Sequence, residues 1–347
     1  MKKIIVSTLL LGVIVHSVLA QKKQHIAVQH DKARKEVVVK VNNEPFTALI
    51  YPDSLEKPTL YPILAANGEI ITRGFPLVPR PNEPTDHPHH IGLWMNYESV
   101  NGLDFWNNSS AIPQDKKNKY GWIKKTAISE VKSGNAGVIK YVADWSDIHQ
   151  HTLLKEHTTF IFTATEGYRT IDRTTTLTAA QHVSFKDVKD GFLGLRVARE
   201  LELPSKEERK YTDTQGVVTS VEGNATDIVT GNYLTSENKE GDHVWGTRGK
   251  WCMLYGKKGG DTISIVIIDH PSNVGYPTYW HARGYGLFAA NPLGQKIFSN
   301  GTEALNLALE TGKSATFRYR VVIASGKERL STEEINRLSA EFADSSK

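Results

Sequence analysis

The sequence contains a single cysteine, Cys252, so the chain cannot close a disulfide bond on itself. Trp251 and Met253 flank this cysteine in a short apolar run, where a thiol behaves as a small buried hydrophobic group. A chain of 347 residues is long enough to bury a large core. We therefore expect the fold to be stabilised by its core alone.

Long apolar runs are also missing, except at the N-terminus. Two lysines precede an apolar run over residues 4–15, and a small-residue cleavage site ends at Ala20. This pattern predicts a signal peptide over residues 1–20, and hence a periplasmic or secreted protein. No later apolar run approaches the roughly 20 residues that a membrane helix needs. We expect no membrane insertion after the signal is cleaved.

A strong excess of one charge is absent as well. The formal net charge is +4, and removal of residues 1–20 would take away two lysines and leave +2. Proteins that bind nucleic acids electrostatically carry a basic patch or stripe, which this near-neutral chain lacks. We expect no nucleic-acid partner.

Helical patterns are scarce, because most of the patterned sequence alternates or is rich in β-branched residues. Strand-like runs cover residues 35–41, 45–51, 137–145, 156–164, 168–179, 191–203, 249–256, 261–270 and 314–324. Without helices between them, these runs exclude a parallel α/β sheet. The chain therefore predicts an all-β fold, a large antiparallel β-sandwich or barrel, as one domain over residues 22–330.

The end of the chain is the exception. Residues 331–343 have a helical pattern, and Ser331 and Glu334 have the spacing of a capping box. We expect a short C-terminal helix and tail over residues 331–347. The weakest patterns, over residues 52–135 and 204–248, predict loops that carry ligand chemistry.

One such loop, DHPHHIGLWMNYESVNGLDFW at residues 86–106, contains His87, His89 and His90. If DHPHH is extended, Asp86 and His90 lie on one face, and His87 and His89 on the other. The imidazoles could bind a divalent metal with a third ligand, act as acid or base, or cap turns. We favour acid–base chemistry or substrate hydrogen bonding, because the sequence motif lacks a distant third ligand.

The same stretch holds aromatic residues beside carboxylates. Trp94 and Trp106, with Asp104 close by, suit a sugar, whose C–H face stacks on rings while its hydroxyls meet polar groups. The alternation over residues 93–97 is equally typical of a strand that packs inward. Both interpretations remain open.

Two later segments add candidates. The Gly/Pro-rich segment 269–294 holds Tyr279, Trp280, His281, Arg283 and Tyr285, a density typical of a pocket wall, with structural packing as the alternative. Glu310 ends a strand ahead of a glycine turn and the last strand. It could protrude into a cleft as a base, or be an ordinary hairpin residue.

Ordered blocks of the chain resemble a bacterial family of exported proteins of unknown function that carries the label "methane oxygenase PmoA". The blocks are DHPHHxGLW with NGxDFW, FKDVKDGFLGLRVA, VWGTRGKWCML, DHPSN with PTYWHARGYGLFAANPLG, and TFRYRVVI, over roughly residues 40–325. Ile91 stands where many relatives have arginine. The membrane methane monooxygenase subunit of that name spans the membrane several times, whereas this chain has no span after the signal, so we do not carry copper or methane oxidation over.

A looser similarity is to galactose-mutarotase-type proteins, which have a large antiparallel sandwich, or supersandwich. That similarity implies a glutamate base and a histidine acid acting on a sugar. Glu310 matches the place of the glutamate, and His87, His89, His90 or His281 that of the acid. Fold similarity alone does not establish function.

Together these observations predict an exported carbohydrate-active enzyme of the epimerase, glycoside hydrolase or lyase type. His90 or His281 would be the acid, Glu310 the base and Arg283 a charge stabiliser. The expected substrate-binding residues are His87, His89, Trp94, Asp104, Trp106, Tyr279, Trp280 and Tyr285. The alternatives are a non-catalytic carbohydrate-binding protein, and a metal-dependent enzyme using His87, His89 and His90. No cofactor is expected, unless a divalent metal binds at His87 and His89.

Overall fold

The computed structural model describes residues 23–205, 209–212, 218–221 and 228–345. The predicted signal peptide lies outside these ranges. Among the described residues, no helix has both the length and the apolar character needed to cross a membrane.

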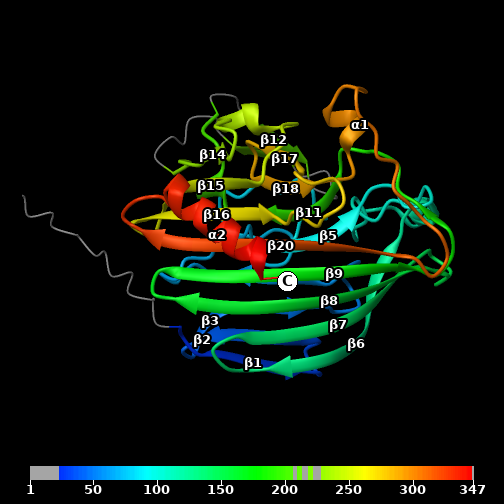
Figure 1. The fold of residues 1–347 in the computed structure, drawn as a ribbon, viewed down its shortest axis with the longest axis horizontal. Coiled ribbons are helices and arrows are strands. Elements are labelled where there is room, and N and C mark those ends of the chain that lie inside the picture. The colour runs from blue at the N-terminus through cyan, green and yellow to red at the C-terminus, as the bar shows by residue number, and fades with distance from the viewer. Residues whose placement is uncertain (1–22, 206–208, 213–217, 222–227, 346–347) are drawn as a thin grey trace, which may run out of the picture.

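Two eight-stranded antiparallel sheets face each other, which confirms the predicted β-sandwich (Figure 1). In spatial order, the first sheet contains β1 (Ile26–Asp31), β2 (Glu36–Val41), β3 (Glu44–Ile50), β4 (Thr59–Ile63), β5 (Leu93–Tyr97), β11 (Gly191–Arg196), β18 (Leu287–Asn291) and β17 (Tyr279–Arg283). The second contains β14 (Asn232–Thr235), β15 (Trp251–Lys258), β16 (Asp261–Asp269), β20 (Ser314–Gly326), β9 (Tyr168–Ala179), β8 (Thr152–Thr165), β7 (Gly137–Ser146) and β6 (Trp122–Lys132).

The remaining elements are short. Two small antiparallel ladders pair β10 (Val183–Ser184) with β19 (Ala308–Leu309), and β12 (Arg209–Thr212) with β13 (Val218–Val221). The helical elements are η1 (Gln114–Lys119), η2 (Arg199–Leu201), η3 (Gly241–Val244), α1 (Gln295–Phe298) and α2 (Thr332–Asp344). The ranges expected to be loops also contain strands, since β4, β5 and β6 lie within residues 52–135 and β14 within 204–248.

Helix α2 confirms the predicted C-terminal helix. The Ser331 hydroxyl accepts a hydrogen bond from the Glu334 backbone N–H at 3.2 Å, as the capping spacing predicts. Ile335 and Phe342 are buried against apolar residues of β15, β16 and β20, so the helix covers the outer face of the second sheet (Figure 1).

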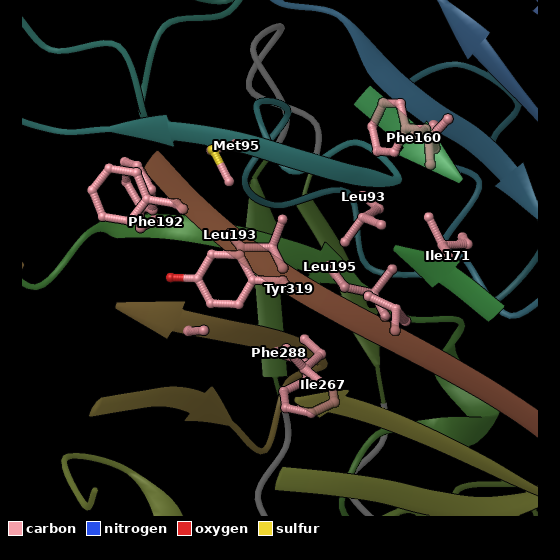
Figure 2. Packing of buried hydrophobic residues seen from close by; sticks show 14 of the residues in the cluster. Leu93, Met95, Phe160, Ile171, Phe192, Leu193, Leu195, Ile267, Phe288 and Tyr319 are labelled. Atoms are coloured by element: carbon pink, nitrogen blue, oxygen red, sulfur yellow. The ribbon is translucent and has the colours of Figure 1, made fainter. Parts of the chain in front are cut away.

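The main core lies between the two sheets. Along β20, Phe317, Tyr319 and Val321 point into it, as their alternation predicts. Figure 2 shows residues of both sheets meeting there, among them Leu93, Met95, Phe160, Ile171, Leu195, Ile267 and Phe288. Cys252 is fully buried in the same core, and burial raises the pKa of its thiol well above the usual range.

Strand β5 separates the core from the candidate site. Leu93, Met95 and Tyr97 point into the main core, so the alternation over residues 93–97 does mark a strand that packs inward. Trp94 points to the opposite face of the first sheet. There it forms a separate apolar cluster with Trp106, Leu287, Ala289 and Tyr285. This second face carries the site.

Candidate functional site

Four aromatic rings, three from the histidine loop and β5 and one from a distant turn, form one continuous stack. The Tyr285 ring lies 5.2 Å from the His87 ring at an angle of 5°, and His87 lies 4.8 Å from His90, also at 5°. His90 in turn lies 5.2 Å from Trp94 at 21°. Trp106 packs against Trp94 at 5.1 Å. The stack joins the loop before β5 to the turn between β17 and β18.

The histidine loop is a turn, so the face assignment that holds for an extended DHPHH does not apply. His87 has a positive φ of 46°, and the His90 N–H donates to the His87 carbonyl at 3.0 Å. The buried Arg73 holds this turn by donating to the carbonyls of His87, at 2.9 Å, and Pro84, at 3.2 Å. Because the chain reverses, His87 and His90 stack on each other instead of lying on opposite faces.

Asp86 orders this loop, although the sequence did not single it out as a functional residue. Its Oδ1 accepts hydrogen bonds from Arg73 Nη1 at 2.8 Å and Arg196 Nη2 at 3.1 Å. Its Oδ2 pairs with Nδ1 of His87. Burial alone would raise the pKa of Asp86, but Arg196, the bond from His87 and Arg73 hold it well below its usual range. The carboxylate therefore stays ionised.

The Asp86 carboxylate gives His87 a defined orientation. An ionised carboxylate only accepts hydrogen bonds, so Nδ1 of His87 carries a proton, and in the neutral form of the ring the lone pair is on Nε2. The His87 side chain is 40% exposed, whereas His89 and His90 are buried. A reachable imidazole oriented by a buried carboxylate is the arrangement of a general base.

His90 is neutral because it is buried among positive charges. Burial and the charges around it lower the pKa of both His90 and His89 well below the usual value. Arg196 Nη1 lies 3.3 Å from Nδ1 of His90, and a guanidinium can only donate, so the ring proton of His90 is on Nε2. That Nε2 has no hydrogen-bond partner among the described residues. His90 thus offers a buried neutral N–H, and near pH 7 it has no additional proton to release as an acid.

Lys57, which lies just before β4, contacts both the histidine turn and the stack. No sequence pattern pointed to it. Its ammonium donates to the His89 carbonyl at 2.8 Å and lies 5.6 Å from the centre of the Trp94 ring. Burial lowers the pKa of Lys57 to about 8. The lysine therefore links the histidine turn to the tryptophan end of the stack.

Strand register brings His281 onto the same face as Trp94. Trp94, Gly194, Ala289 and His281 are successive partners across β5, β11, β18 and β17. Gly194 is required at this point, because a Cβ atom there would lie 2.6 Å from Cζ2 of Trp94. We refer to His87, His90, Trp94, His281 and Tyr285 together as the histidine face.

His281 is buried and neutral. Its Nδ1 lies 3.8 Å from Oδ1 of Asp190, too far for a hydrogen bond, and has no hydrogen-bond partner in the described part of the chain. Burial lowers the pKa of His281 to about 4, although the charge of Asp190 opposes the shift. Like His90, this imidazole carries no additional proton near pH 7 and cannot act as a charged acid.

Carboxyl groups gather around Asp190. Burial raises the pKa of Glu98, and the negative charge of Asp190 raises it further. Burial also raises the pKa of Asp104, although its bonds from Asn107 at 2.9 Å oppose the shift. A carboxyl group with a raised pKa can hold a proton closer to neutral pH, which is what a general acid needs.

Tyr285 lies between the Asp86 and Asp190 sides of the histidine face. Burial raises its pKa, and both Asp190 and Asp86 lie close enough for their charges to add to this shift. Arg283 is exposed, with its guanidinium carbon 5.9 Å from the Tyr285 ring and 5.6 Å from the Trp245 ring. Arg283 and Tyr285 thus form the outer rim beside His87.

Four of the predicted substrate-binding residues, all tryptophan or tyrosine, are buried. Trp94 and Trp106 are 0% and 1% exposed, so they form the floor under the histidines and offer no open platform. Trp280 is also fully buried but belongs to the main core, where it lies 6.2 Å from the Phe288 ring. Tyr279 is buried against Phe298 at 5.4 Å.

The structure does not bring Glu310 to the histidine face. Its side chain is 75% exposed beside the small β10–β19 ladder, where Oε1 lies 3.1 Å from Nδ1 of the exposed His182. No contact between Glu310 and the histidine face is found among the described residues. The described residues also contain no group of three or more His, Cys, Asp and Glu side chains placed to hold a metal ion, so the metal alternative lacks a third ligand there.

Comparison with known proteins gives a family but no activity. The model of a family of unknown function, DUF6807, matches residues 36–340. No curated protein matches the chain. Among solved structures, the chain is similar to the GH36 alpha-galactosidase AgaB from Geobacillus stearothermophilus, with 12% identity and a TM-score of 0.35, covering 87% of this chain but only 41% of that one.

Two shorter proteins are matched over nearly their whole length. A galactose mutarotase-like protein from Clostridium acetobutylicum is 9% identical, with a TM-score of 0.35, and the match covers 89% of this chain and 99% of that one. A putative aldose 1-epimerase from Escherichia coli K12 is 10% identical, with a TM-score of 0.29, covering 87% and 99%.

Proposed function

Because the chain belongs to DUF6807, a family whose function is unknown, we propose its function from the histidine face itself. This face binds a carbohydrate and acts on it by acid–base chemistry, with His87 as the general base. The observation that carries the proposal is the Asp86–His87 pair, in which a buried, ionised carboxylate orients a partly exposed imidazole.

The surrounding groups suit a sugar. Tyr285 ends the ring stack at the rim beside the partly exposed His87, and Arg283 adds an exposed cation that can bind a hydroxyl or an acidic group. The buried N–H of His90 has no described partner and is a further donor. Flat rings beside a few directional polar groups are the usual composition of a sugar site.

In the proposed reaction, Nε2 of His87 removes a proton from a sugar hydroxyl, a C–H group or an attacking water. A carboxyl group of raised pKa, Asp104 or Glu98, returns a proton to the leaving oxygen or to the opposite face of the carbon. Epimerisation, glycoside hydrolysis and elimination all use such a pair. Glu310 has no part in it.

The test is a screen of neutral and acidic glycosides, followed by His87→Ala on any substrate that is turned over. Loss of a general base should lower kcat/KM by roughly 10²–10⁴-fold. The matched control is His151→Ala, because His151 also pairs with an aspartate, Asp147, at 3.0 Å but is 75% exposed elsewhere on the surface. Full activity in a folded His87→Ala protein would refute the assignment. Binding without turnover would make the protein a carbohydrate-binding one.

A further inference from the structure

A cavity of about 960 Å³ lies away from the histidine face, where the edge strands of the two sheets meet. Edge strands β1 and β6 contact each other, and the Val28 N–H donates to the Ser133 hydroxyl at 2.9 Å (lower edge of Figure 1). The cavity is lined from the first sheet by His30, Lys32 and Tyr51, and from the second by Trp122 and Lys125. Its volume lies in the range of small-molecule sites.

The shape of β6 places two consecutive lysines on this cavity. In a regular strand, neighbouring side chains point to opposite faces. The register between β6 and β7 shifts between Lys125 and Ala127, which is a bulge, and Lys124 and Lys125 both line the cavity. Lys124 is bound within the protein, since its ammonium donates to the carbonyls of Asp53, at 3.0 Å, and Leu55, at 2.5 Å.

Two of the lining cations take no part in a close ion pair among the described residues. Lys35 forms an ion pair with Asp53. Lys32 and Lys125 form no ion pair with any described residue. Both lie close to His30, whose pKa is lowered by burial and then by these two charges. Asp53, Asp144 and Asp147 line the cavity as well, against the four lysines Lys32, Lys35, Lys124 and Lys125, so one positive charge is left over for an anionic group.

Aromatic rings lie beside this charge. The Tyr51 hydroxyl is 2.6 Å from Nε2 of His30, which fixes the ring, and Lys125 Nζ is 4.6 Å from the ring centre. Trp122 adds a second partly buried ring to the lining. Cations next to flat, partly exposed rings suit a ligand that has both an anionic group and an apolar ring face.

We propose that this cavity binds a short anionic oligosaccharide, with its carboxylate or sulfate at Lys32 and Lys125 and a sugar ring against Tyr51 and Trp122. Nucleic acids need a longer basic stripe, because each phosphate contact is weak and several must act together. None of the residues of the histidine face lines the cavity, so the two sites are separate.

Calorimetric titration of the full chain tests the inference with three trisaccharides: a uronate, its carboxyl-reduced neutral counterpart and a sulfated one. We expect the uronate or the sulfated sugar to bind, and the neutral one to bind at least tenfold more weakly. Lys32→Met and Lys125→Met should each weaken binding by about tenfold, the usual effect of losing one charge-assisted contact. Methionine keeps the apolar stem over Tyr51, so folding should be preserved.

The matched control is Lys132→Met, since Lys132 is an exposed residue at the end of β6 that does not line the cavity. Its affinity should equal that of the wild type. His87→Ala should also keep full affinity, which separates this site from the histidine face. Equal binding of the neutral sugar, tighter binding of a short oligonucleotide, or loss of binding in His87→Ala alone would each overturn the inference.

Discussion

Replacement of Asp86 by alanine should destabilise the protein strongly, because it would leave two buried guanidinium groups without their shared counter-ion. The side chains of Arg73 and Arg196 are both 0% exposed, and Asp86 itself is only 13% exposed. Breaking a buried ion pair by removing one partner typically costs about 3–5 kcal/mol. Glu202 remains 3.9 Å from Arg196 after the change, so we expect a loss near 3 kcal/mol, the lower end of that range.

Urea unfolding at pH 7 measures this loss, and its pH dependence tests the cause. The folded pKa of Asp86 lies below the ordinary value of 3.8. A carboxylate with a depressed pKa contributes stability above its unfolded pKa, and this contribution is lost as the pH falls toward its folded pKa. The gap between wild type and Asp86→Ala should therefore be constant from pH 7 to about pH 5 and narrow below pH 3.8. A loss under about 1 kcal/mol, or a gap that does not narrow in acid, would refute the reasoning.

Other substitutions test single features of the fold and site. Gly194→Ala should destabilise the fold by about 1–3 kcal/mol in thermal unfolding, because its Cβ would meet two buried tryptophan rings, while Gly326→Ala, whose Cβ meets nothing closer than 3.8 Å, should change little. Glu310→Gln should leave kcat/KM unchanged, since this exposed carboxylate contacts only an exposed histidine; a large loss would restore it as the base. His281→Gln should lose less stability than wild type between pH 7 and pH 5. The folded pKa of His281 is about 4, so unfolding takes up a proton in this window and acid destabilises the wild type; equal losses would contradict that pKa.

The sheet architecture was largely predictable, because alternation along a strand is a local property. Residues 168–179 and 314–324 were expected as strands, and they are β9 and part of β20. Strand β6 was missed. It is an edge strand with lysines and two register shifts, so it lacks a clean apolar face and its pattern is weak.

The histidine loop was found from its composition, since so many imidazoles and rings in one short segment are unusual for a loop. Its internal geometry was not predictable. The loop is a turn with a positive φ at His87. It is held by Arg196 at the end of β11 and by Arg73 from the segment between β4 and β5. Nothing in the sequence marks these arginines or Asp86 as partners.

The sequence by itself determined the fold class, the C-terminal helix and the segments that carry the site, because each depends on side chains close together along the chain. The roles of the individual groups depend on which side chains meet across the sheet and on how much water they keep. Only the tertiary structure decided that His87 is oriented by Asp86, that His90 and His281 are buried and neutral, and that Glu310 is exposed beside His182, away from the histidine face. Burial and long-range charge set a pKa, and neither is a local property of the sequence.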